Sequence, residues 1–136
     1  MLESTGGIII LEGDVNNSNY EKSLKDFSQE FGKVLDPVAF LNEKNSALCA
    51  SFLRLHELTL SDGLISKRHK FFIHAAITAV QHDREATMMH ITGAIKSGAT
   101  EEELLEVAYT LIPVAGMPSF AVFIGALQQV RSQLNQ

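Results

Sequence analysis

The stretch DREATMMHITGAIKSGATEEELLE, residues 83–106, decides the fold of this chain. Residues 84–97 are predicted to form one helix, and Gly98 is a residue type that commonly follows the last turn of a helix. Thr100 and Glu103 then fit a capping box, in which each side chain satisfies a backbone amide at the start of the next helix. The stretch therefore predicts two consecutive helices joined by a short connection.

Helical periodicity continues on both sides of this stretch. Upstream, apolar residues recur at helix spacing from Tyr20 to Leu35, and Asp36-Pro37 is predicted to stop that helix. A second helix is predicted over residues 46–58. A third, apolar nearly all round, is predicted from an N-cap at Ser66 to a break at residues 81–83. Downstream, a break is predicted over residues 113–118, followed by a last helix. The fold class is therefore all-α, with about six helices.

The chain is long enough to bury a core of its own, because it has 136 residues. Residues 1–18 are predicted to be an N-terminal arm, in which GIIILEG could form a short strand. Residues 19–136 are predicted to be a single helical domain. The apolar stripes are generous for a monomer of this size, which favours a homo-oligomer.

Composition and charge exclude several classes of function. The net charge of −5 argues against a nucleic-acid partner. The longest apolar run, residues 71–80, is too short to span a bilayer, and the first residues lack the basic region of a secretory signal. We therefore expect a cytoplasmic protein without membrane contact. Cys49 is the only cysteine, so the chain has no internal disulfide and no Cys-x-x-Cys pair.

His90 is the candidate catalytic residue. Its neighbours one helical turn away are small (Ala86, Thr87, Gly93 and Ala94), which leaves space beside the imidazole. An unperturbed histidine titrates near neutrality, as proton transfer requires. The alternative is a hydrogen-bonded histidine at a helix contact. Asp83 lies about two turns, roughly 10 Å, from His90 and is better placed as a helix N-cap.

Three cations are candidates for binding a substrate carboxylate. Arg84 lies in the first turn of the helix that carries His90; the alternative is a solvated or interface residue. Lys67 and Arg68 belong to SKRHK, residues 66–70, at a helix N-terminus, where the helix dipole disfavours positive charge. This cluster either binds an anionic ligand or pairs with acidic residues such as those at 101–103. Both alternatives stay open.

No metal site is predicted. His74, His82 and His90 follow one another at intervals of eight residues, but no pair has the i, i+4 spacing that chelates on one helix. A helix break also separates His74 from His90. His74 is interpreted as a core histidine.

The order of these features resembles the carboxymuconolactone decarboxylase-like family, which includes the alkylhydroperoxidase D proteins. The resemblance covers residues 47–130 and is carried by His90, Ala94, Gly98, Thr100, Glu102, Glu103 and Gly116-Met117-Pro118. It implies an alkylhydroperoxidase D-like helical fold and assembly as a trimer or hexamer.

The redox branch of that family carries Cys-x-x-Cys-x-x-x-His, with a glutamate twelve residues before the first cysteine. Counted back from His90, the cysteine positions hold Asp83 and Ala86, and the glutamate position holds Phe71. The chain is therefore expected to lack an alkylhydroperoxidase cycle. The decarboxylase branch, which also lacks the cysteine pair and keeps the histidine, is closer.

Two functions remain. The first is a cofactor-free decarboxylase or lactone-type enzyme, a carboxy-lyase acting on a small carboxylated substrate. His90 would be its proton donor or acceptor, and Arg84, Lys67 or Arg68 would hold the carboxylate, since a developing carbanion needs a cation and a proton donor. The second is a catalytically inactive binding or scaffold protein on the same fold.

Overall fold

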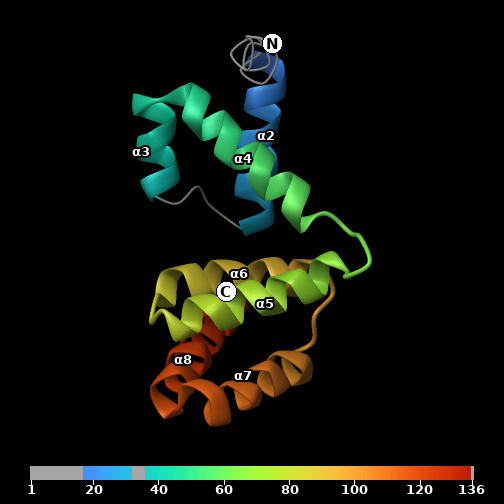
Figure 1. Cartoon of the computed structure of the whole chain (residues 1–136), viewed down its shortest axis with the longest axis vertical. Helices are drawn as coiled ribbons and strands as arrows, with labels where there is room; N and C mark the ends of the chain where they lie inside the picture. Colours follow the sequence, from blue (N-terminus) through green and yellow to red (C-terminus); the bar gives the residue numbers. More distant parts are fainter. Residues whose placement is uncertain (1–16, 32–35, 136) are drawn as a thin grey trace. The chain divides into compact units, whose positions relative to one another are not determined.

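The computed structural model of the chain describes residues 17–31 and 36–135 (Figure 1). These residues form seven α-helices and no strand, which confirms the all-α prediction. The chain divides into two compact units, residues 1–59 and residues 60–136. Most of the predicted arm, with its predicted strand, lies outside the described residues. A single domain over residues 19–136 stays a prediction.

The first unit contains α2 (Asn17–Phe31), α3 (Asp36–Lys44) and nearly all of α4 (Ser46–Leu60). An aromatic cluster joins α2 to α4. The ring of Phe27 lies 4.7 Å from that of Phe31 and 5.2 Å from that of His56, measured between centroids, and Phe52 completes the group. Phe27 and Phe31 are buried, so this cluster is part of the core of the unit.

The helix α3 was not predicted, because Asp36-Pro37 was interpreted only as the stop of the preceding helix. These two residues begin α3. Proline suits the first turn of a helix because the amide it lacks would have no partner there and its fixed φ is already helical. An Asp-Pro pair can therefore start a helix as well as stop one. This helix accounts for seven helices where about six were expected.

The second unit contains α5 (Lys67–Val80), α6 (Arg84–Lys96), α7 (Glu101–Ala115) and α8 (Met117–Leu134). Helices α5 and α6 lie side by side, and α8 packs against α6 and α7 (Figure 1). The fully buried positions alternate alanines with larger side chains: Phe71, Ala75, Ala79, Ile91, Ala94, Leu104, Ala108, Phe123 and Ala126. None of the helices in the described ranges is long and apolar enough to cross a membrane.

The turn between α5 and α6 confirms the predicted break at residues 81–83. His82 adopts a φ of 57°, the left-handed conformation that reverses the chain. The Asp83 carboxylate then accepts a hydrogen bond of 3.0 Å from the amide of Ala86, so Asp83 is the N-cap of α6. The predicted N-cap of α5 is also confirmed, because the Ser66 hydroxyl accepts from the amide of His69.

The boundary between α7 and α8 is narrower than predicted. The break expected over residues 113–118 is confined to Gly116, whose φ is 84°. Pro113 lies inside α7, where its ring φ is helical and only one backbone bond near the helix end is lost. Pro118 lies in the first turn of α8, where a missing amide costs nothing.

The predicted capping box of α7 is confirmed and extends into an ion pair. The Thr100 hydroxyl accepts from the amide of Glu103, and the Glu103 carboxylate accepts from the amide of Thr100. The same carboxylate pairs with the guanidinium of Arg68 in the first turn of α5. The hydrogen bond from the Thr100 amide, together with Arg68, holds the pKa of Glu103 below its usual value.

Replacing Glu103 with glutamine is expected to remove a pH-dependent part of the stability. The folded-state pKa is lowered, so the carboxylate stabilises the fold above its unfolded pKa of about 4.3, and the contribution disappears as the pH falls through the folded value. Urea unfolding should show a lower midpoint for Glu103→Gln at neutral pH and no difference in strong acid. The matched control is Glu102→Gln, an exposed residue of the same turn. An equal effect of both variants at every pH would contradict this account.

Candidate functional site

His90 faces a second histidine across the α5–α6 pair. It lies on α6, and its side chain is 8% exposed. His74 of α5 lies opposite, with ring centroids 5.0 Å apart and ring planes at 87°. Both residues are eight positions from His82, at the centre of the turn. The reversal at His82 therefore brings the two imidazoles together.

The surroundings of this pair are apolar on one side and hydrogen-bonded on the other. Phe71, fully buried, places its ring 6.5 Å from that of His90. On the side toward the turn, the hydroxyls of Thr78 and Thr87 lie 2.9 Å apart. Thr87 also donates a 2.7 Å bond to the backbone carbonyl of Asp83. These contacts fix α5 against α6 on both sides of the histidines.

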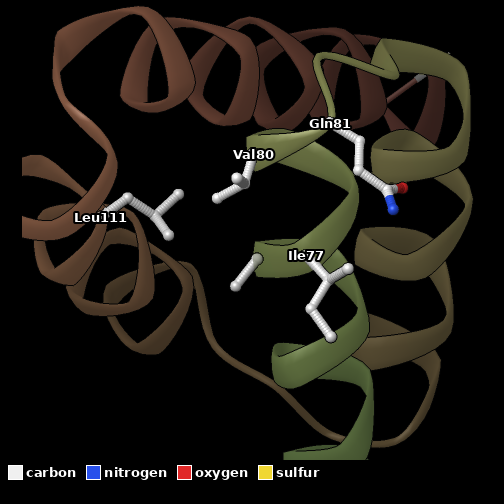
Figure 2. Close-up of a pocket in the computed structure, with 5 residues that line it drawn as sticks. Ile77, Val80, Gln81 and Leu111 are labelled. Carbon is white, nitrogen blue, oxygen red and sulfur yellow. The ribbon is translucent and has the colours of Figure 1, made fainter.

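Two pockets open along α5, and Ile77 lines both. The first has a volume of about 250 Å³ and is lined by His74, Ile77, Thr78 and His90. The second has a volume of about 320 Å³ and is lined by Ala76, Ile77, Val80, Gln81 and Leu111. Figure 2 shows Val80 of α5 and Leu111 of α7 pointing toward one another in the second pocket, with the amide of Gln81 pointing away from Leu111. The two pockets thus share one lining side chain, and the two imidazoles and the Thr78 hydroxyl belong to the first.

Burial lowers the pKa of His74 below its usual value of about 6.5. The imidazole is half-buried, and desolvation disfavours its charged form. His74 is therefore neutral at neutral pH, and a neutral imidazole has one nitrogen that donates and one that accepts a hydrogen bond. A neutral imidazole beside a second histidine can accept a proton and pass it on.

The Arg84 side chain contacts α8. Its guanidinium donates a 3.0 Å hydrogen bond to the backbone carbonyl of Gly125. A Cβ at position 125 would lie 3.0 Å from the guanidinium, so the glycine leaves the room that Arg84 occupies. Arg84 thus fastens the start of α6 to the middle of α8.

Lys67 and Arg68 are also engaged elsewhere. Arg68 pairs with Glu103 of the same chain. For Arg68, this confirms the alternative in which the cation pairs with the acidic residues of α7. The ammonium of Lys67 lies 5.9 Å from the centroid of the Phe71 ring. The described residues that line the pocket beside His90 do not include Lys67, Arg68 or Arg84. Their binding of a substrate carboxylate stays a prediction.

The comparisons with known proteins give one match. The model of the carboxymuconolactone decarboxylase family matches residues 47–129, more than half of the chain. The chain belongs to the carboxymuconolactone decarboxylase family. Searches of the curated proteins and of the solved structures found no match. The matched residues include His74, His90 and both pockets.

This member of the carboxymuconolactone decarboxylase family has a single cysteine, Cys49. The positions that hold cysteines in the redox branch, Asp83 and Ala86, are joined here by the N-cap hydrogen bond of α6. Cys49 belongs to the first unit and is fully buried, with its sulfur 3.8 Å from the carbonyl of Val38. Over residues 17–31 and 36–135, no group of three or more histidine, cysteine or acidic residues is arranged to hold a metal.

Sequence reasoning missed His74, Ile77 and Thr78 as site residues. The usable signal was the equal spacing of three histidines. Histidines eight residues apart cannot chelate a metal on one helix. In a helical hairpin with the middle histidine at the turn, however, the two outer histidines face each other, because they are equidistant from the turn. Phe71 and Gly93, each eleven residues from His82, follow the same rule and also touch.

Proposed function

We propose that this member of the carboxymuconolactone decarboxylase family is a cofactor-free decarboxylase or lactone-type enzyme acting on a small carboxylated substrate. The observation that carries the proposal is the meeting of His90 and His74 at a pocket, in a chain without a second cysteine. The histidines support acid–base chemistry, and the single cysteine gives no support to a dithiol cycle.

His90 acts as the proton donor to carbon. In the decarboxylation the bond between the carboxylate and its carbon breaks, and carbon dioxide leaves. The electron pair stays on the carbon and spreads onto a neighbouring carbonyl oxygen of the substrate as an enolate. The carbon then takes a proton from the His90 imidazolium. Between cycles water reprotonates His90, and the neutral ring of His74, 5.0 Å away between centroids, can relay that proton.

Release of carbon dioxide tests the proposal. Purified protein is incubated with carboxylated lactones and with β-keto acids, and the gas is measured by a coupled assay, with His90→Gln protein in parallel. Catalysed release that depends on His90 supports the proposal. The scaffold alternative, which the loss of three redox positions motivates, predicts no turnover by either protein.

The chain is expected to have no hydroperoxidase activity of its own. Cys49 is fully buried and has no second cysteine to resolve an oxidised sulfur. A hydroperoxide assay with a dithiol donor should give the uncatalysed rate for the wild type and for Cys49→Ser alike. A family member that has both cysteines is the positive control. A catalysed rate that Cys49→Ser abolishes would refute this prediction.

We also propose a cytoplasmic homo-oligomer, a trimer or hexamer, without a nucleic-acid or membrane partner. Support comes from exposed apolar side chains in the second unit, among them Ile73, Val114 and Met117. Sedimentation analysis measures the subunit number directly, and a monomer at micromolar concentration would contradict the proposal.

A further inference from the structure

We infer that the paired pockets form a binding site for a monocarboxylate with an aliphatic tail, with the carboxylate at His74 and the tail across Ile77 toward Val80 and Leu111. This inference names the ligand class of the site proposed above and rests on that proposal. It also assigns the binding of the carboxylate to His74 in place of Arg84, Lys67 and Arg68.

The head of the ligand is assigned by the groups that line the first pocket. Its described lining contains two imidazoles, one hydroxyl and one isoleucine. The Thr78 hydroxyl lies 3.0 Å from the carbonyl of His74 and 2.9 Å from the hydroxyl of Thr87, so local bonds already engage it. The imidazoles are then the groups that meet an anion.

The tail is assigned by the second pocket. Its described lining is four apolar side chains and the Gln81 side chain. Ile77 and Val80 are about half exposed, so a ligand that covers them removes apolar surface from water. Because Ile77 lines both pockets, we place the polar head and the aliphatic tail of one ligand on either side of this residue.

Binding of the carboxylate is expected to bring a proton with it. Burial keeps His74 neutral in the free protein, and an adjacent carboxylate favours the imidazolium, so the ligand raises the pKa of His74. Helix α5 packs against α6, α7 and α8. The titratable ring of α6 that faces His74 is His90. On α7, Glu103 pairs with Arg68. On α8, Arg131 pairs with Glu101. These ion pairs engage the named charged groups of α7 and α8, so we assign the proton to His74, the ring that the ligand's charge acts on directly.

Hexanoate is the probe, and its affinity is measured by calorimetry in buffers of different ionisation enthalpy. Affinity should rise as the pH falls from about 8 to about 6, with uptake of up to about one proton per ligand. Hexanoate should bind more tightly than butyrate, by about threefold to fourfold for each additional buried methylene. Hexanol, which lacks the carboxylate, should bind with no pH dependence.

Two variants separate the head from the tail. His74→Gln should abolish proton uptake and the pH dependence, whereas the matched control His82→Asn, an exposed histidine in the turn, should retain both. Val80→Asp places a charge in the second pocket at a half-exposed position and should weaken hexanoate at least tenfold, with little effect on acetate. Circular dichroism checks that each variant is folded.

Three results would overturn the inference. One is failure of hexanoate to bind at millimolar concentration. Another is pH-dependent binding that survives His74→Gln but is lost in Lys67→Gln or Arg84→Gln. The last is equal affinity for hexanoate and hexanol. The measurement is independent of turnover. Hexanoate binding without His90-dependent release of carbon dioxide would refute the proposed function alone. His90-dependent release of carbon dioxide without hexanoate binding would refute the inference alone.

Discussion

Replacing His90 with glutamine is expected to lower the rate of carbon dioxide release by about 10²–10⁴-fold, the usual contribution of a general acid or base. Glutamine is similar in length and still forms hydrogen bonds, but it cannot carry the proton to carbon. The loss should fall on kcat, because His90 acts in the transition state, while KM changes little. Initial rates at saturating substrate measure the effect.

The matched control for this experiment is His82→Asn. It removes a histidine from the turn between the same two helices, and asparagine tolerates the positive φ of that position. Its activity should equal that of the wild type. If His90→Gln kept the full rate while His82→Asn lowered it, His90 would be a packing residue and the proposed mechanism would be wrong.

Replacing Gly93 with alanine is expected to destabilise the second unit by up to about 2 kcal/mol net, because overpacking a core costs about 1–3 kcal/mol. A Cβ at this position would lie 2.7 Å from two carbons of the Phe71 ring, which is fully buried and cannot move aside freely. The better helix propensity of alanine, about 1 kcal/mol, opposes this loss without cancelling it. Urea unfolding of both proteins measures the difference.

Two further variants show whether the contact with Phe71 is the cause. Gly63→Ala is the matched control, because the nearest atom to its Cβ would be the Lys70 ammonium at 3.8 Å. The double variant Gly93→Ala with Phe71→Leu should be less destabilised than the sum of its single changes, since the smaller side chain leaves room. A Gly93→Ala protein as stable as the wild type would show that α5 and α6 are not packed as described.

Local signals predicted most of the second unit. The capping residues Ser66, Asp83 and Thr100 were each assigned from sequence, and each makes the expected backbone hydrogen bond. Such caps are readable because donor and acceptor lie within three residues of each other. The start of α3 at Asp36-Pro37 was not readable, because a proline suits both a helix end and a first turn.

The site was less predictable, because its geometry depends on contacts between helices. His74 was interpreted as a core residue while it was considered on α5 alone. Only the reversal at His82 places it against His90. Arg84 was a candidate for a substrate carboxylate, but the structure directs it to the carbonyl of Gly125, 41 residues away. Periodicity within one helix contains no information about such a partner.

The most direct test of the central claim is a nuclear Overhauser measurement between the ring protons of His74 and His90. With ring centroids 5.0 Å apart, the account predicts a cross-peak between the two rings. The cross-peak should vanish in His74→Gln and persist in His82→Asn. If both rings are assigned and no cross-peak connects them, the two histidines do not share a pocket, and the acid–base pair proposed here does not exist.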